Sequence, residues 1–210
     1  MPDPLKILDS TDTLPETIGW FRHAEIKHGR VAMAAFVGYI VQSNGYYWPW
    51  ALTGSGVTHE QISAAGSPPE QWDALPFEAK AQIILAIGTF ELIGEYTSIL
   101  ELNGEKHYVR GGKPGYYPPF KGIFKAGLWP HPMPLSLYDP LGFSASKTQE
   151  QKERGLLVEL NNGRLAMIGI FGFLAESKIP GSVPALTGIV KPYAGEYMAP
   201  FTADASSMIY

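Results

Sequence analysis

A nine-residue motif occurs twice in this chain and limits the possible folds more than any other feature. Glu25-Ile-Lys-His-Gly-Arg-Val-Ala-Met33 returns 134 residues later as Glu159-Leu-Asn-Asn-Gly-Arg-Leu-Ala-Met167, with Glu, Gly, Arg, Ala and Met identical. An apolar run follows each copy. Two helices with one motif predict a pseudo-twofold pair packed face to face, in which small residues let the backbones approach closely. The small residues are Ala32, Gly38, Ala166, Gly169 and Gly172.

Three segments have the apolar runs of long helices, and proline and glycine punctuate the connections between them. These segments cover approximately residues 16–43, 77–100 and 147–178. Each apolar core is shorter than the roughly 20 residues that span a hydrocarbon layer of about 30 Å. Hydropathy alone, with a mean of −0.04, therefore favours the buried helices of a soluble bundle.

The composition excludes several classes of function. Lys and Arg number 16 against 20 Asp and Glu, a net charge of −4, which argues against a nucleic-acid binder because phosphates require a basic face. The absence of cysteine excludes disulfides, thiolate metal sites and cysteine nucleophiles. The first residues lack the pattern of a secretory signal or an organelle transit peptide, so either the protein is made where it works or this is a processed chain. Its length suits one domain over residues 1–210.

Helical geometry decides which charges of the repeated motif can pair. At about 100° per residue, Glu25 and Arg30 lie about 140° apart around one helix, too far to pair with each other. We therefore expect two crossed ion pairs, Glu25 with Arg164 and Glu159 with Arg30. Such pairing makes four charges tolerable within a bilayer, and the motif then extends the first and third apolar cores to spanning length.

The same motif offers metal donors. A carboxylate has more lone pairs than one arginine can use, so each Glu can pair with Arg and still bind a metal. His28 and Asn162 occupy matching positions in the two copies. Imidazole and amide share little as acid, base or nucleophile, but both are neutral single-point donors. This pattern indicates a hard, magnesium-like centre with one open axial position.

These residues carry a resemblance to a known family. Glu25-x-x-His28-x-Arg30 and Glu159-x-x-Asn162-x-Arg164, each followed by Ala-Met, resemble the first and third transmembrane helices of the light-harvesting chlorophyll-binding superfamily. The run Phe21–Met33 is most similar to the algal chlorophyll a/c branch with fucoxanthin or peridinin. Further similar segments are Ala81–Ile84 and Gly88–Glu91 of the middle helix and Tyr138-Asp-Pro-Leu-Gly-Phe143 before the third.

The resemblance implies a fold, a location and a role. The fold is all-α with three transmembrane helices, the first and third forming a crossed pseudo-twofold pair. The chain would be a multi-pass protein of the plastid (chloroplast) thylakoid membrane, with its N-terminus on the stromal side. It would be a non-enzymatic scaffold for chlorophyll a, chlorophyll c and carotenoid of the peridinin, fucoxanthin or diadinoxanthin type. Its partners would be a photosystem core, neighbouring antenna subunits and thylakoid lipids.

The resemblance also implies the axial ligands of chlorophyll magnesium. Glu25, His28, Glu159 and Asn162 occupy the family's ligand positions, with Arg30 and Arg164 as the crossed partners. Glu91 follows the pattern of the middle helix, although Glu95 one turn later is an alternative. Three further cofactor-binding candidates can also be read as solvated or capping residues at helix ends: Gln42, Gln82 and Glu176.

Several features have a second interpretation. His23, His59, His107 and His131 are interpreted as surface histidines, and Tyr46–Trp50 as an interfacial aromatic belt that could also pack against carotenoid. Glu25-x-x-His28 has the spacing of di-iron carboxylate enzymes, which require it twice, whereas the second copy has Asn162. Within the superfamily, a photoprotective quencher would use the same ligands as an antenna protein.

Overall fold

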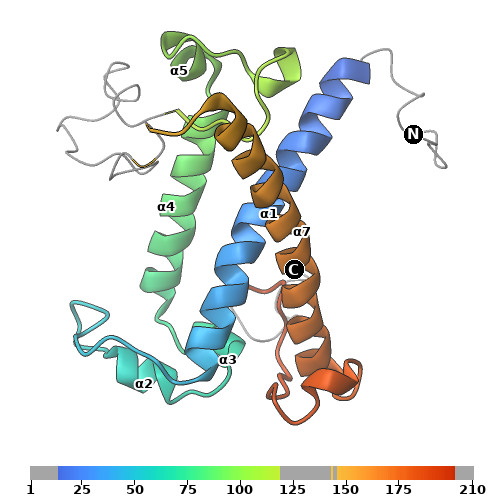
Figure 1. Ribbon diagram of the computed structural model, residues 1–210. Coiled ribbons are helices and arrows are strands. Elements are labelled where there is room, and N and C mark those ends of the chain that lie inside the picture. The colour runs from blue at the N-terminus through green and yellow to red at the C-terminus, as the bar shows by residue number, and fades with distance from the viewer. Residues whose placement is uncertain (1–13, 119–142, 144–145, 202–210) are drawn as a thin grey trace. The chain divides into compact units, whose positions relative to one another are not determined.

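The computed structural model describes residues 14–118, 143 and 146–201. His131 and residues 138–142 of the segment before the third helix lie outside this part. The all-α prediction is confirmed, and the only β-type pairing in the described part is a single antiparallel bridge between Ala51 and Thr58. No helix in the described part is long and apolar enough to cross a membrane. The elements in Figure 1 are α1 (Leu14–Ser43), α2 (His59–Ser63), α3 (Pro68–Asp73), α4 (Phe77–Glu95), α5 (Thr97–Leu102), η1 (Tyr108–Arg110), α7 (Gln149–Lys178) and η2 (Pro184–Leu186).

The bounds of the first and third long helices are confirmed to within two residues. The second was predicted to continue to Leu100, and this is wrong. It ends at Glu95, because Tyr96 has an extended backbone with φ −76° and ψ 108°, and α5 starts at the next residue. The break turns Ile99 and Leu100 inward, where both are buried. Their packing therefore favours a break that the apolar run does not reveal.

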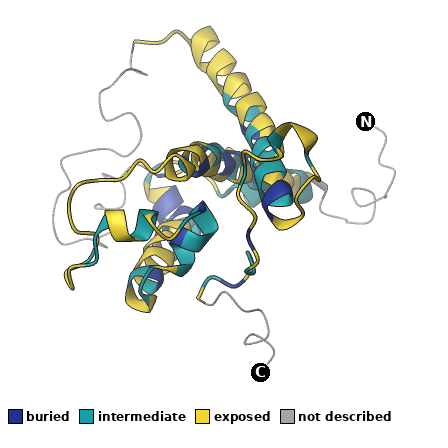
Figure 2. Ribbon diagram, turned by 90° about the horizontal axis from the view of Figure 1, so that it is seen from below, coloured by how far each residue is buried: buried dark blue, intermediate teal, exposed yellow. Residues whose placement is uncertain are grey.

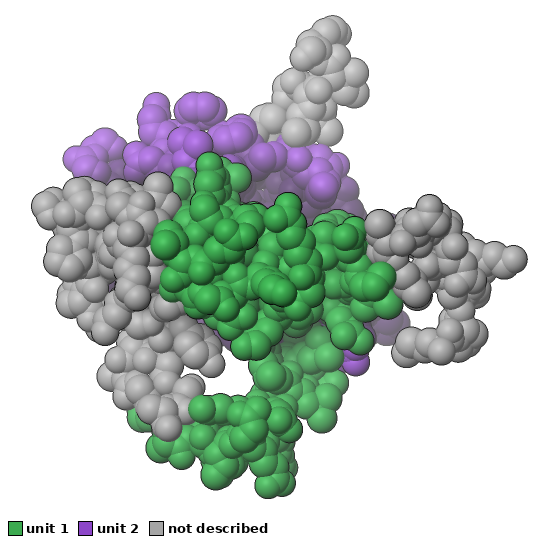
Figure 3. Space-filling view, turned by 90° about the horizontal axis from the view of Figure 1, so that it is seen from above, with its two compact units in different colours: residues 1–30, 87–163 green, residues 31–86, 164–210 purple. Residues whose placement is uncertain are grey.

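The chain divides into two compact units, and each long helix contributes to both. The first unit contains residues 1–30 and 87–163, and the second contains residues 31–86 and 164–210 (Figure 3). The repeated motif lies at the boundary on both α1 and α7. Much of the surface of all three long helices is exposed (Figure 2).

In the first unit, α1 and α7 are in backbone contact at the glycines of the repeated motif. A Cβ atom on Gly29 would lie 3.0 Å from Gly163 Cα, and one on Gly163 would lie 2.9 Å from Gly29 Cα. These glycines are related by the spacing of the repeat, so the predicted symmetric packing is present at this point. This backbone contact therefore uses a pair of glycines that is not among the five small residues predicted for the interface.

In the second unit, aromatic rings make the contact between α1 and α7. The rings of Phe36 and Tyr39 on α1 stack on Phe173 of α7, with centroids 5.1 and 5.0 Å apart. Gly169 admits the Phe36 ring, since a Cβ atom there would lie 2.8 Å from Phe36 Cε2. A Cβ atom on Gly38 would meet nothing within 4 Å. The prediction that these two glycines bring backbones together is wrong, because the Phe36 ring occupies the space at Gly169 and no atom lies close to Gly38.

Residues after α7 fold back onto the second unit. The Tyr193 backbone N–H donates to the Ser177 carbonyl (2.7 Å), and its hydroxyl donates to Asp73 at the end of α3 (2.8 Å). Trp72 Nε1 donates to the Pro200 carbonyl (2.7 Å). α3 itself begins with Pro68, which costs no hydrogen bond because N–H groups in the first helical turn have no intrahelical partner. The C-terminal segment is thereby fixed to α3 and α7.

Candidate functional site

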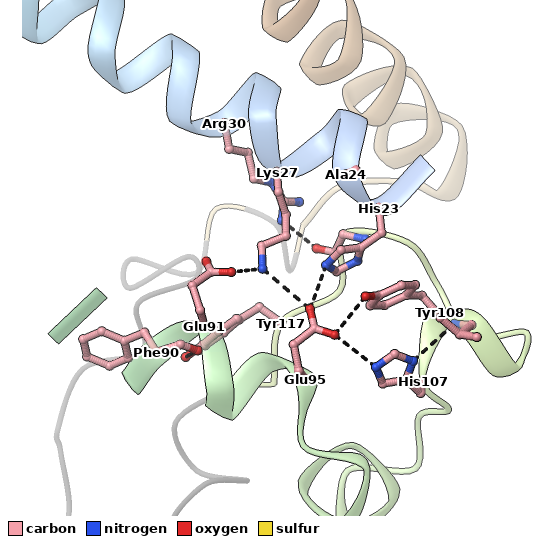
Figure 4. Close-up of polar contacts among 12 residues, drawn as sticks. His23, Ala24, Lys27, Arg30, Phe90, Glu91, Glu95, His107, Tyr108 and Tyr117 are labelled. Carbon is pink, nitrogen blue, oxygen red and sulfur yellow. Dashed lines mark hydrogen bonds and ion pairs between the residues drawn. The ribbon is translucent and has the colours of Figure 1, made fainter. Parts of the chain in front are cut away.

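Two pairs of side chains, one on α1 and one on α4, face each other in the first unit. His23 and Lys27 are four residues apart on α1, as are Glu91 and Glu95 on α4, so each pair lies on one helix face. Lys27 Nζ contacts the Glu91 carboxylate and lies 3.7 Å from Glu95 Oε1, while His23 Nε2 lies 3.3 Å from the same Oε1 (Figure 4). The two helices are therefore joined by the Lys27 cation between two carboxylates, with the His23 ring beside Glu95.

Glu95 is the most engaged carboxylate of this cluster. Its Oε2 lies 3.1 Å from His107 Nε2 and accepts a hydrogen bond of 2.9 Å from the Tyr108 hydroxyl. Burial, together with this carboxylate, raises the pKa of Tyr108 to about 12, so the phenol keeps its proton and remains a donor. Glu95 therefore contacts four side chains on two segments, which indicates a structural role. The alternative that Glu95 is the free ligand of α4 is therefore less favoured than Glu91.

Two histidines of this cluster were misread as surface residues. His23 is buried and stacks on Tyr108, with ring centroids 3.8 Å apart, and its Nδ1 accepts a hydrogen bond of 3.1 Å from Gly115 N. His107 meets Glu95 through Nε2 and accepts from Val109 N through Nδ1 at 3.3 Å. The spacing of four residues in both helices was the signal in the sequence, but it becomes visible only once α1 and α4 are known to face each other.

The predicted pair between Arg30 and Glu159 is present. Arg30 Nε donates to Glu159 Oε1 at 2.6 Å, and Arg30 Nη1 donates to the Gly115 carbonyl at 2.6 Å. His23 accepts from the N–H of Gly115 and Arg30 donates to its carbonyl, so α1 binds both backbone groups of this residue. Gly115 has φ +76°, and a Cβ atom there would lie 2.7 Å from Ile26 Cγ2. A glycine is therefore required at this position.

The second crossed pair stays a prediction, because Glu25 and Arg164 belong to different units. Glu25 is half-buried and Arg164 is exposed. Each of the two residues has an interaction partner.

The donors of the motif have the chemistry that a magnesium ligand needs. His28 Nδ1 lies 2.8 Å from the Ala24 carbonyl, so Nδ1 carries the proton and Nε2 keeps its lone pair on an exposed side chain. The exposed Asn162 amide makes no hydrogen bond with another described side chain or backbone group. Glu159 uses Oε1 for Arg30, which leaves Oε2. The residues present therefore fit a metal that takes one axial ligand from each site.

A bare metal ion would need several such donors together. Within the described residues, no three His, Asp or Glu side chains are grouped so that they could hold one. The donors lie as one Glu and one neutral donor three residues apart on α1 and on α7, and as Glu91 on α4. This arrangement suits a metal that receives its other ligands from a cofactor and takes a single ligand from the protein. It differs from the clustered carboxylates of the di-iron alternative.

The three weaker candidates lie in different surroundings. Gln82 and Gln42 are exposed, and the backbone carbonyl of Gln42 accepts a hydrogen bond of 3.2 Å from Gln71 Nε2. Glu176 is only 2% exposed, and its two oxygens accept from the backbone N–H groups of Gly181 (2.9 Å) and Val183 (2.8 Å). Its interpretation as a solvated helix end is wrong, because it orders the turn that follows α7.

The second unit contains an open cavity that the sequence did not predict. It has a volume of about 450 Å³ and is walled by α1, α3, α7 and residues 193–200, with Gln42 at its rim. Trp72, Leu174 and Tyr197 supply mainly apolar surface. The Tyr39 hydroxyl is buried at this wall without a hydrogen bond to any described group. The cavity thus combines apolar walls with one unsatisfied polar atom.

Comparisons with known proteins agree with the motif. The family model described as chlorophyll A-B binding protein matches residues 2–178. The chain is 30% identical over 183 residues to a fucoxanthin-chlorophyll a-c binding protein, chloroplastic, of Trieres chinensis, covering 87% of this chain and 75% of that protein. It is 31% identical over 206 residues to the protein of that name from Chattonella marina var. antiqua, covering 95% and 72%. Its identity to fucoxanthin-chlorophyll a-c binding protein E of Macrocystis pyrifera is 31% over 179 residues, covering 84% and 68%.

Proposed function

We propose that this chain, which belongs to the family of chlorophyll A-B binding proteins, is a light-harvesting antenna protein that binds chlorophyll a, chlorophyll c and carotenoid and passes excitation energy to a photosystem. The observation that carries this proposal is the doubled motif. Its two glycines are in contact, its Arg30–Glu159 pair is formed, and exposed neutral donors stand at the same position of each copy. The names of the relatives supply the pigment classes.

The work of the protein is to hold pigments at fixed positions and orientations. We propose that Glu25, His28, Glu91, Glu159 and Asn162 each offer one axial ligand to the magnesium of a chlorophyll, with Gln42 and Gln82 as further candidates. Chlorophyll, when bound, supplies light absorption and excitation transfer. His28 is oriented by its bond to Ala24, and Glu159 by Arg30. Such second contacts fix the direction of a ligand and the charge at the site. We omit Glu176, because both of its oxygens serve backbone groups.

We propose that residues 1–210 form one antenna domain, with α1, α4 and α7 crossing the plastid thylakoid membrane and the N-terminus on the stromal side. The 30 residues of α1 and of α7 and the 19 of α4 correspond to about 45 and 28 Å at 1.5 Å per residue, against about 30 Å of hydrocarbon. Pairing of Arg30 with Glu159 and of Lys27 with Glu91 supports this placement, because paired charges are tolerated in lipid. The relatives are named chloroplastic.

The cavity of the second unit supports the carotenoid part of the proposal. An end ring of a xanthophyll is apolar but carries an oxygen, and such a ring would cover the apolar walls and give the Tyr39 hydroxyl a partner. Rings of the fucoxanthin, peridinin and diadinoxanthin types share this chemistry. We further propose that Tyr46–Trp50, in which Trp48 and Trp50 stack at 4.8 Å, lies at a membrane surface. Photosystem core, neighbouring antenna subunits and thylakoid lipids are the proposed partners.

Fluorescence excitation spectroscopy tests the function. The chain is refolded with chlorophyll a, chlorophyll c and fucoxanthin, purified, and excited across the visible range while chlorophyll a emission is recorded. We expect the chlorophyll c and carotenoid bands to appear in the excitation spectrum. A folded chain that retains no chlorophyll, or pigments that do not sensitise chlorophyll a, would refute the proposal. The excited-state lifetime at neutral and acidic pH separates harvesting from quenching, since a quencher shortens it.

A further inference from the structure

Glu91 carries a charge that its own helix cannot neutralise. The residues one turn away on α4 are Ile87 and Gly88 before it and Gly94 and Glu95 after it. The only cation of α4, Lys80, lies eleven residues earlier, which is about 16 Å along a helix. Any compensating charge for Glu91 must therefore come from another element.

Lys27 of α1 supplies that charge. Its Nζ contacts Glu91 Oε2 directly and approaches Glu95 only to 3.7 Å, as Figure 4 shows. Glu95 is already held by His107 and Tyr108, so it does not depend on Lys27. The side chain of Lys27 is 29% exposed, half-sheltered between the two helices.

The pairing leaves Glu91 with one oxygen to offer. Oε2 faces Lys27, while Oε1 makes no hydrogen bond or ion pair with a described group, and the side chain is 52% exposed. A carboxylate paired in this way is neutral together with its partner and still presents a hard oxygen donor. Without the lysine, the same carboxylate would place a net negative charge beside apolar surface, which is costly.

We propose that Lys27 is the positioning residue of a chlorophyll site at Glu91: it neutralises and orients this ligand from a different helix. The inference rests on the proposed function and adds a residue that is not itself a ligand, since a protonated lysine has no lone pair. The repeat supports the assignment, because the position equivalent to Lys27 in the second copy is the neutral Asn161. The cation is thus specific to the helix that faces Glu91.

Three variants test this role in chain refolded with pigment. Lys27→Met should lose about one chlorophyll per protein, in line with the roughly 10–100-fold loss of metal affinity when the partner of a ligand is removed. Lys27→Arg should keep that chlorophyll, because the charge is retained. Lys27→Met with Glu91→Gln should regain it, since an amide oxygen can ligate magnesium without a compensating cation. Lys152→Met, at an exposed site on α7, is the matched control and should lose no pigment.

The double variant separates positioning from simple stapling of two helices. If Lys27 only joins α1 to α4, the double variant lacks the ion pair and should be as defective as Lys27→Met, which would overturn the proposal. Full pigment content in Lys27→Met would overturn it as well. A wild-type chain that binds no chlorophyll refutes the proposed function itself, whereas a pigmented wild type with an unaffected Lys27→Met refutes only this inference.

Discussion

Replacing Gly163 by alanine places a methyl group where α1 and α7 are in backbone contact. The new Cβ atom would lie 2.9 Å from Gly29 Cα, whereas ordinary contacts of this kind are 3.4–4 Å. The helices must therefore separate by several tenths of an ångström, close to the Arg30–Glu159 bond of 2.6 Å. Overpacking of this kind costs about 1–3 kcal/mol, while alanine returns about 0.5–1 kcal/mol of helix propensity.

Gly155→Ala is the matched control for this change. It lies on the same helix, and a Cβ atom there meets nothing within 4 Å, so it gains the propensity without the clash. The difference between the two variants isolates the contact and should be about 1–3 kcal/mol. For a chain of this size, each kcal/mol corresponds to about 2–4 °C in the melting midpoint.

The assay is thermal loss of pigment circular dichroism at one fixed heating rate, because unfolding of such complexes need not be reversible. We expect Gly155→Ala to melt at or above the wild-type temperature and Gly163→Ala to melt several degrees below Gly155→Ala. Gly29→Ala should behave like Gly163→Ala, since its Cβ atom would lie 3.0 Å from Gly163 Cα. Equal midpoints for Gly163→Ala and Gly155→Ala would show that the helices do not meet at these glycines.

Three further predictions concern charges and ligands. Arg30→Leu leaves Glu159 without its partner. The loss of one partner of a buried pair costs about 3–5 kcal/mol, and the cost here is smaller because both side chains are partly exposed. Pigment yield should fall, and adding Glu159→Gln should restore part of it. His28→Leu should lose about one chlorophyll per protein that His28→Asn keeps, since only the amide has a lone pair; equal pigment-to-protein ratios would contradict the ligand role. Hydrogen bonds from the Ser67 hydroxyl and N–H lower the pKa of Glu70 below its ordinary 4.5, so the stability it adds is present above that value and lost as pH falls. The difference in melting midpoint between wild type and Glu70→Gln should shrink on acidification, and a difference independent of pH would refute this.

The helices that the sequence predicted well are those specified by local signals. The apolar runs and the repeat specify α1 and α7, and the Arg30–Glu159 pair follows from helical angles together with the repeat. The end of α4 was missed because it depends on the burial of Ile99 and Leu100 rather than on any breaker residue.

The parts of the site that were missed depend on contacts between distant segments. His23 becomes a partner of Glu95 because α1 faces α4, and His107 does so because the segment after α5 returns to the end of α4. Glu176 is buried by backbone groups of the turn after α7. The Pro180-Gly181 pair marks this turn in the sequence but does not indicate that a side chain of the helix binds its backbone. The cavity has walls from four segments, so no single stretch of sequence encodes it.

The sequence separation between Arg30 and its partners determines when each partner becomes available during synthesis. Glu159 follows Arg30 by 129 residues, so at roughly 5–20 residues per second the ribosome needs about 6–26 s to deliver the partner. Gly115, 85 residues away, arrives earlier, and Glu91 reaches Lys27 earlier still, after 64 residues. Synthesis order therefore sets the earliest moment at which each polar contact of the α1 motif can form. The Arg30–Glu159 pair can form only after the motif of α7 has been made.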